Sequence, residues 1–192
     1  DAGGINGKKI ELTLHDAKLT EYRPAIEAAC QQDFALVGGG AVQDNLWTEV
    51  GVPCDLIDIA GFAVTADKAG TAGQDPTSVR TVQPVPNPSD RYPVGPALLL
   101  QEDFPEAGQR MGILFSDFQT LVDQKNKEKQ AFEAIDHQVV HEAAYNVMGE
   151  TNWKPFATAM EQADVRMLKF IGEAGNAGAL EAAMAQTGYQ PE

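Results

Sequence analysis

Three consecutive glycines form the clearest chemical signal in the sequence. Gly38-Gly39-Gly40 follows a short apolar block, precedes a predicted helix, and has Asp58 about 20 residues further on. A glycine-rich turn between a strand and a helix can bind the phosphates of a dinucleotide, and an acidic residue at the next strand end can bind its ribose. In a G-x-G-x-x-G pattern that begins at Gly38, however, Gln43 occupies the third glycine position. The sequence therefore favours a tight turn over a Rossmann-like cofactor site, and we expect no cofactor.

The histidines and cysteines do not combine into a catalytic group. His137, His141 and Glu142 lie close together on a predicted strand, but no third ligand is nearby, so we expect no metal site. Cys30 and Cys54 are neither a C-x-x-C pair nor next to a basic residue that would lower a thiol pKa. Two cysteines fit one disulfide or two buried thiols. We expect no catalytic residues and a protein that is not an enzyme.

The charge balance excludes one large class of partner. The chain has 192 residues, with 14 Lys and Arg against 28 Asp and Glu, and a formal net charge of −14 at pH 7. Nucleic-acid binding depends on basic residues that neutralise phosphates, so we expect no nucleic-acid partner. No apolar run reaches the roughly 18 residues that a membrane span needs. The length is sufficient for one large domain or two small ones.

The apolar residues of the first half alternate between strand and helix patterns. Strict alternation predicts a strand, three-to-four spacing predicts a helix, and a short continuous apolar block predicts a strand that is covered on both faces. By these rules we expect strands at Ile10–His15, Phe34–Val37, Leu56–Ala60 and Val79–Val82, and helices at Tyr22–Gln32 and Ala41–Val50. The segment from Val64 to Pro88, rich in Gly and Pro, is otherwise predicted to be loop.

The same alternation continues in the second half. We expect helices at Asp90–Glu106, Gln119–Ala134, Asn152–Gln162 and Ala174–Gln186, and strands at Met111–Phe115, Gln138–Tyr145 and Val165–Ile171. Repeated β-α units with buried strands are typical of a doubly wound α/β protein. The long loop and the change near Gly108 predict two α/β lobes, residues 1–105 and 106–192.

In open α/β sheets, ligands bind beyond the carboxyl ends of the strands, where backbone N–H groups at the next helix N-terminus are free. Four loops of the predicted fold lie there. They are Gly38–Asp44, Gly61–Thr65, Ser116–Leu121 and Gly172–Ala174. We expect the ligand-binding residues among them.

The order of several short motifs resembles the type I periplasmic solute-binding proteins of ABC importers, in particular the branched-chain amino acid receptor group. The motifs run almost the whole length of the chain. They are Gly3-Gly4-Ile5-Asn6-Gly7, Phe34-Ala35-Leu36-Val37-Gly38-Gly39, Gly51-Val52-Pro53, the strand end at Met111–Asp117, Thr151-Asn152-Trp153 and Gly188-Tyr189. None is diagnostic alone, but their order and spacing together carry the resemblance.

The resemblance implies two α/β lobes that close on a small solute, with no catalysis. It implies an extracytoplasmic location, in the periplasm or at the cell surface, with a lipid anchor in a preceding segment as an open alternative, and a membrane permease as partner. It also implies that the chain is incomplete at both ends: members of this family begin with a strand and a helix before Gly3-Gly4 and continue beyond Gly188-Tyr189. An unpaired sheet edge in such a partial chain could pair in a homodimer.

The resemblance also implies the positions of the ligand-binding residues. Family receptors hold a carboxylate in the loop after the second strand, which here is Gly40-Ala41-Val42-Gln43-Asp44, without the usual hydroxyls. A second contact loop matches Phe62-Ala63-Val64-Thr65. In the other lobe Phe118 stands near the position of the family's stacking tyrosine, and Glu173 and Ala174 lie at the last loop. These differences indicate an amino acid other than plain leucine, or a related small organic acid.

Export of the family favours the disulfide alternative for Cys30 and Cys54. Cys30 ends the first predicted helix and Cys54 precedes the third predicted strand, so the two can approach each other across one neighbouring element.

Two other functional classes remain as alternatives. A nucleotide-dependent oxidoreductase would use the loop Gly38–Gly40, and a ligand-sensing regulator would need a DNA-binding segment, of which the sequence shows none.

Overall fold

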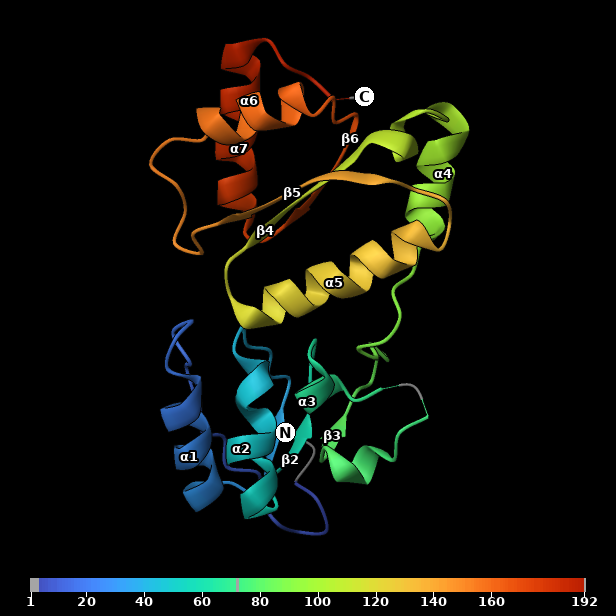
Figure 1. Cartoon of the computed structure of the whole chain (residues 1–192). Coiled ribbons are helices and arrows are strands. Elements are labelled where there is room, and N and C mark those ends of the chain that lie inside the picture. The colour runs from blue at the N-terminus through green and yellow to red at the C-terminus, as the bar shows by residue number, and fades with distance from the viewer. Residues whose placement is uncertain (1–3, 72, 192) are drawn as a thin grey trace.

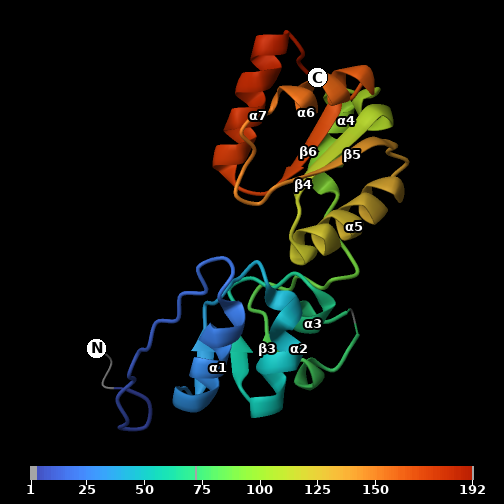
Figure 2. The ribbon, with the colours of Figure 1, turned by 60° about the vertical axis from the view of Figure 1, so that its left-hand side comes forward.

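The chain folds into two lobes that each contain a three-stranded parallel sheet. The computed structural model describes residues 4–71 and 73–191. Figure 1 and Figure 2 show the first lobe below the second, with α5 between the second sheet and the first lobe. The strand order is β1-β2-β3 in the first sheet and β5-β4-β6 in the second. Among the helices described, none combines the length and apolar character that crossing a membrane requires.

The first lobe is built from short elements. Its strands are β1 Ala35–Val37, β2 Ile57–Ile59 and β3 Thr81–Val82. Its α-helices are α1 Tyr22–Gln32, α2 Trp47–Val50 and α3 Ala66–Ala69, and its 3₁₀ turns are η1 Asp44–Leu46, η2 Val52–Cys54 and η3 Pro76–Ser78. The helices α1 and α2 pack on one face of the sheet, where Ile26, Trp47 and Leu56 form a buried cluster against Leu36.

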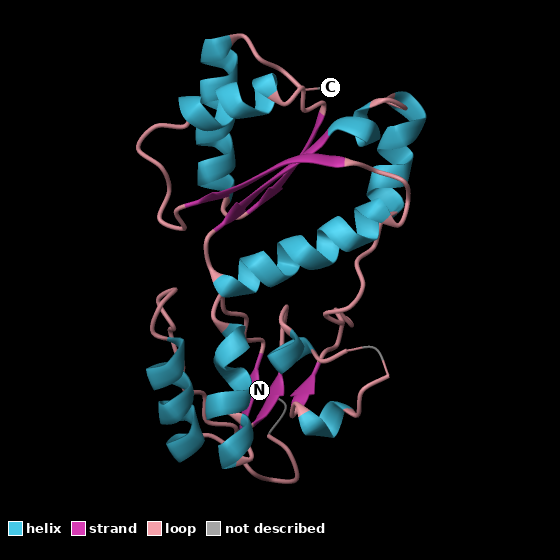
Figure 3. Cartoon of the chain, in the orientation of Figure 1, coloured by secondary structure: helices cyan, strands magenta, loops and turns pink. Residues whose placement is uncertain are grey.

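The second lobe has longer elements. Its strands are β4 Met111–Ser116, β5 Val139–Tyr145 and β6 Met167–Ile171. Its helices are α4 Gly95–Asp103, α5 Gln119–Glu133, α6 Lys154–Gln162 and α7 Ala174–Thr187, with a 3₁₀ turn η4 at Ala107–Arg110. The sheet is covered on both faces, by α6 and α7 on one and by α4 and α5 on the other (Figure 3). This lobe therefore has the three-layer packing of a doubly wound protein.

Most of the predicted elements are confirmed. The helix expected at Tyr22–Gln32 has those bounds, and in the second lobe each expected strand and helix is present with small shifts at its ends. The helix expected at Ala41–Val50 is shorter, because residues 41–43 are coil and a 3₁₀ turn precedes α2. The helix expected at Asp90–Glu106 begins at Gly95, after Pro93. Proline disfavours helical geometry in the residue before it, which explains the later start.

One predicted strand is absent, and another is present but is not covered on both faces as predicted. Residues Ile10–His15 are coil, and Leu12 is 81% exposed, because none of the strands in the described part of the chain pairs with this segment. Alternation predicts the side-chain pattern of a strand, but a strand forms only when a partner accepts its hydrogen bonds. The block at β1 is not covered on both faces, since Val37 is exposed while Leu36 is half-buried.

Helix α4 packs with the second sheet. Ala97 of α4 lies in one buried cluster with Met111 and Ile113 of β4. The boundary expected after residue 105 falls between these two elements. We therefore propose that the second lobe begins at α4, with the connection between lobes in the preceding residues.

Candidate functional site

The two predicted ligand loops of the first lobe are joined to each other. Gly39 accepts backbone hydrogen bonds from Gly61 and Phe62 at 2.9 and 3.2 Å. A Cβ atom added to Gly40 would lie 3.2 Å from Cβ of Phe62, so the loops are in close contact. The loop 38–44 follows β1 and the loop 61–65 follows β2, and these strands are parallel neighbours. Both loops therefore lie at the carboxyl edge of the first sheet, where α/β proteins bind ligands.

Asp44 connects these loops to the second lobe. Its Oδ2 accepts a hydrogen bond of 2.7 Å from the backbone N–H of Val64, and its Oδ1 lies 3.4 Å from Oγ1 of Thr120 in α5. Oγ1 of Thr120 also lies 3.3 Å from Oδ1 of Asn45. Asp44 and Thr120 are both buried. The amino end of α5 thus rests directly on the loop after β1.

Burial makes the carboxyl group of Asp44 harder to ionise. Loss of hydration raises the pKa of Asp44, and hydrogen bonds from Val64 and Thr65 together with the charge of Lys68 act in the opposite direction. The raised pKa shows that desolvation outweighs these favourable contacts. Asp44 therefore joins the lobes as a carboxyl group with little access to water.

A buried lysine lies beneath the same loops. The ammonium of Lys68 forms an ion pair with Asp58, donates a hydrogen bond of 3.1 Å to the hydroxyl of Tyr22, and lies 4.4 Å from the ring centre of Trp47. Asp58 is fully buried in β2. Its carboxylate is directed at Lys68 inside the lobe and is not available at the strand end to bind a ribose. This placement counts against the dinucleotide interpretation of Gly38–Gly40.

A second polar contact connects the lobes further along α5. The ammonium of Lys127 lies 3.3 Å from Oδ1 of Asn87, and the amide of Asn87 donates a hydrogen bond of 2.7 Å to the backbone oxygen of Ala63. Burial lowers the pKa of Lys127, and the nearby charge of Glu128 opposes this effect. Asn87 thus links the loop after β2 to the middle of α5.

A tyrosine lies beside the turn that leads from β6 into α7. The hydroxyl of Tyr145, at the end of β5, donates a hydrogen bond of 3.1 Å to the backbone oxygen of Ile171. Burial raises the pKa of Tyr145 to about 12. A Cβ atom on Gly172 would lie 1.5 Å from this hydroxyl, so a larger residue here would force the tyrosine or the backbone to move. Glu173 and Ala174 follow directly and are exposed.

Comparison with solved structures identifies the fold of this chain. A leucine-, isoleucine-, valine-, threonine- and alanine-binding protein from Brucella ovis, in a closed conformation, matches with a TM-score of 0.70 and 16% identity over 100% of this chain and 50% of its own. The chain has the fold of type I periplasmic binding proteins.

Two further solved structures with this fold are similar. A solute-binding protein of an ABC transporter from R. palustris, in complex with 4-hydroxybenzoate, has a TM-score of 0.62 and 16% identity over 86% of this chain and 44% of its own. A putative branched-chain amino acid ABC transporter protein from Rhodospirillum rubrum has a TM-score of 0.58 and 12% identity over 99% and 53%. The chain therefore spans about half the length of the solved structures it matches.

No family model and no curated protein matches the sequence. The chain thus has the type I binding-protein fold with a sequence far from those of the solved proteins.

The predicted site residues divide into three groups within this binding-protein fold. Gly40 and Phe62 are exposed, whereas residues 41–43 and Phe118 are half-buried. Asp44, Ala63, Val64 and Thr65 are fully covered. Thus the predicted second loop contributes mainly Phe62 to the accessible surface, and its other residues support the contact between lobes. The assignment of a ligand to these residues stays a prediction.

Sequence reasoning did not single out Thr120, Asn87 or Lys127. Thr120 lies inside the predicted loop Ser116–Leu121, and a threonine in the first turn of a helix is the only local signal for it. Asn87 and Lys127 carry no such signal, because their roles depend on residues of the other lobe. In the described residues, no three His, Cys, Asp or Glu side chains are grouped to hold a metal ion.

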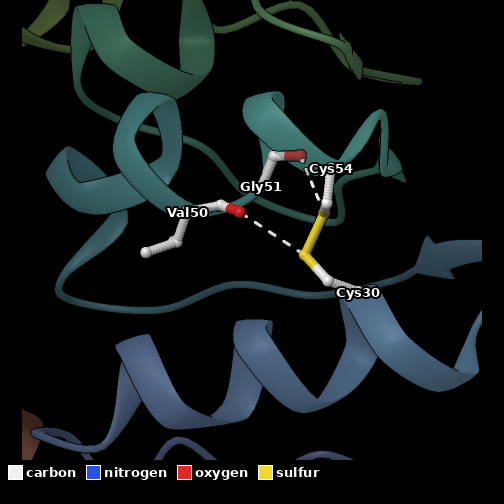
Figure 4. Close-up of a disulfide and its surroundings, with 4 residues drawn as sticks. All are labelled: Cys30, Val50, Gly51 and Cys54. Carbon is white, nitrogen blue, oxygen red and sulfur yellow. Dashed lines mark hydrogen bonds between the residues drawn. A yellow bond between two sulfur atoms is a disulfide. The ribbon is translucent and has the colours of Figure 1, made fainter.

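The disulfide expected between Cys30 and Cys54 is present (Figure 4). It joins the end of α1 to η2, and its sulfur atoms lie close to the backbone oxygens of Val50 and Gly51. The bond ties the outer helix of the first lobe to the segment that leads into β2. It therefore stabilises the scaffold of the two loops rather than forming part of them.

Proposed function

We propose that this chain is part of an extracytoplasmic solute-binding receptor of an ABC importer, which captures a small molecule between its lobes. The observation that carries the proposal is the contact between Asp44 and Thr120, which brings the carboxyl edges of both sheets together in the fold of periplasmic binding proteins. A receptor needs no catalytic residues, and none are proposed here. A membrane permease would be its protein partner.

We further propose that the solute is an amino acid or a related small organic acid. The site offers the N-terminus of the long helix α7, which lies at the carboxyl edge of the second sheet. Helix N-termini favour a carboxylate. Phe62 and Phe118 supply apolar surface for the rest of the molecule. The disulfide between Cys30 and Cys54 fits an oxidising compartment outside the cytoplasm.

Ligand binding to the purified chain tests this function. Amino acids and small aromatic acids are added one at a time while thermal unfolding is followed, and each compound that raises Tm is titrated by calorimetry. A specific ligand stabilises the folded state according to its concentration relative to Kd. We expect at least one carboxylate to bind with 1:1 stoichiometry. If none of these compounds raises Tm or binds in calorimetry, the proposed function is wrong.

Matched variants locate the binding site. Phe118→Ala and Phe62→Ala each remove an accessible ring from the proposed site, whereas Lys154→Ala changes an exposed residue at the start of α6. We expect each Phe variant to weaken binding about tenfold, which corresponds to about 1.4 kcal/mol. Lys154→Ala is expected to bind like the wild type. A ligand that binds all three variants equally would lie outside the proposed site.

A further inference from the structure

The contact between the lobes holds fewer protons than its oxygen atoms need. Oγ1 of Thr120, at the start of α5, lies 3.4 Å from Oδ1 of Asp44 and 3.3 Å from Oδ1 of Asn45. A threonine hydroxyl has one proton, so it donates to only one of these two oxygens. An ionised carboxylate oxygen and an amide oxygen are both acceptors only. With Asp44 ionised, one of the two oxygens therefore faces the hydroxyl oxygen with no proton between them.

One further proton on Asp44 completes this set of hydrogen bonds. A protonated Oδ1 of Asp44 donates to Oγ1 of Thr120, and Thr120 then donates to Oδ1 of Asn45. Oδ2 stays available to accept the backbone N–H of Val64, at 2.7 Å. Asp44 and Thr120 are each only 1% exposed, so bulk water has little access to supply the missing hydrogen bond.

The charged groups that face Asp44 from the first lobe have other partners. The ammonium of Lys68 in α3 forms an ion pair with Asp58 of β2 and donates a hydrogen bond to the hydroxyl of Tyr22 in α1. Burial raises the pKa of Tyr22, and the charges of Asp44 and Asp58 raise it further. The charge of Lys68 is thus already balanced by Asp58.

From the second lobe, Lys127 of α5 is within reach of the charge of Asp44. Its ammonium lies 3.3 Å from Oδ1 of Asn87, and Glu128 and Asp90 also act on its charge. Burial is the largest influence on the carboxyl group of Asp44 and raises its pKa. The neutral form that completes the hydrogen bonds is therefore also the form that burial favours.

We propose that Asp44, Asn45 and Thr120 form a proton-operated clasp between the lobes, which is strengthened when Asp44 takes up one proton from solvent and weakened when it releases that proton. The lobes therefore stay in contact for a larger fraction of the time as pH falls. In a receptor that captures its solute between the lobes, the solute would be held more tightly at lower pH. This last consequence rests on the proposed function, whereas the clasp itself does not.

The titration of Asp44 tests the arrangement of protons. Asn45→Leu removes the acceptor of the Thr120 proton and keeps a side chain of similar size at the contact. Thr120 then donates to the ionised carboxylate, so we expect the pKa of Asp44 to fall by about half a pH unit or more, the size of one ordinary hydrogen bond. The pKa is measured by NMR from the side-chain carboxyl carbon of Asp44, whose signal is assigned by its loss in Asp44→Asn.

The opposite orientation of the Asn45 amide predicts a different result. Its N–H₂ group would then lie against Thr120, and Thr120 would already donate to the carboxylate. In that case Asn45→Leu would raise the pKa of Asp44 or leave it unchanged, and either result overturns the proposal. Asn126→Leu, at an exposed asparagine of α5, is the control. It should leave the pKa of Asp44 unchanged, and an equal fall in this variant would also contradict the clasp.

Resonance energy transfer measures the contact between the lobes in the solute-free chain. Dyes are attached to Glu27→Cys in α1 and Glu161→Cys in α6, at exposed positions of the two lobes, with the disulfide intact. We expect transfer to increase from pH 8 to pH 5, with its midpoint at the pKa of Asp44 found by NMR. Asp44→Asn offers an N–H₂ group to Thr120 and an oxygen to Val64 at every pH, so its transfer should be high and constant.

The two remaining outcomes of this measurement contradict the proposal. Transfer that does not change with pH would show that the clasp does not control the lobes. A rise that is equal in wild type and in Asp44→Asn, with wild-type circular dichroism for both, would assign the effect to other groups. Neither measurement uses a solute, so failure of the clasp is distinguishable from failure of the proposed function, which solute binding tests.

Discussion

Oδ1 of Asp44 in the first lobe lies 3.4 Å from the hydroxyl oxygen of Thr120 in the second, and the two residues are 76 positions apart in the sequence. The same carboxyl group accepts the backbone N–H of Val64 through Oδ2. One buried side chain thus supports both the loop after β2 and the contact between the lobes.

Replacing Asp44 separates the role of its shape from the role of its charge. Asp44→Ala leaves the buried N–H of Val64 without an acceptor, so we expect the free energy of unfolding to fall by about 1–3 kcal/mol. Asp44→Asn keeps an oxygen for Val64 and removes the cost of burying a charge. It should therefore be clearly more stable than Asp44→Ala at pH 7. Chemical denaturation measures both, and equal loss in both variants would show that the charge is the essential feature.

The pH dependence of stability provides a second check on Asp44. Its pKa in the folded protein lies above the ordinary aspartate value of 3.8, so between these two pKa values the folded protein binds more protons than the unfolded chain. In that window this group makes the protein more stable as pH falls. The stability of the wild type relative to Asp44→Asn should therefore increase as pH is lowered towards 3.8. A difference that stays constant with pH would contradict the raised pKa.

For His137 we expect the opposite pH dependence of stability, at higher pH. His137 is buried, its ring stacks on Phe132, and burial lowers its pKa below 6.5. The unfolded chain therefore binds the proton first, so the stability from this group is complete above pH 6.5 and falls as pH decreases from there to the folded pKa.

His137→Leu tests this trend. The variant should lose part of the decrease in stability between pH 7 and pH 5 seen in urea unfolding of the wild type. The pKa of His141 is also lowered by burial, so its contribution should persist in the variant. An unchanged pH profile in His137→Leu would exclude His137 as a source of the acid sensitivity.

The disulfide between Cys30 and Cys54 closes a loop with a sequence separation of 24. In the chain-entropy account, a loop of this length contributes about 3 kcal/mol by restricting the unfolded chain. We expect the double variant Cys30→Ala, Cys54→Ala to unfold at lower denaturant concentration by about this free energy. Reducing agent should destabilise the wild type by a similar amount and leave the double variant unaffected. Equal denaturation midpoints with and without reductant would argue against this stabilising role.

Gly172 is a position where a single methyl group meets a fixed hydroxyl. Gly172→Ala would place its Cβ atom 1.5 Å from Oη of Tyr145, at a φ of +156°. Overpacking of this kind costs about 1–3 kcal/mol, so we expect a lower Tm. Gly178→Ala, in α7 with no atom near its added Cβ, should instead stabilise by about 0.5–1 kcal/mol. Differential scanning calorimetry compares the two, and an equal change in both would remove Tyr145 as the cause.

The sequence by itself determined the elements whose formation depends on nearby residues. The spacing of Ile26 and Ala29 was sufficient for α1, and the order of strands and helices was sufficient for the α/β class. Helix hydrogen bonds connect residues four apart, so the local pattern contains what the helix needs. The cysteine pair also followed from the sequence, once the resemblance to an exported family was included.

Only the tertiary structure decided features that need a distant partner. Ile10–His15 has the pattern of a strand and is coil, because hydrogen bonding in a sheet requires a neighbouring strand. Asp44 was predicted as a ligand residue, yet it is buried in a contact with Thr120 of the other lobe. Val37 was predicted to be covered, yet it is exposed. Burial and strand pairing are set by contacts between segments far apart in the chain, which no local pattern of side chains specifies.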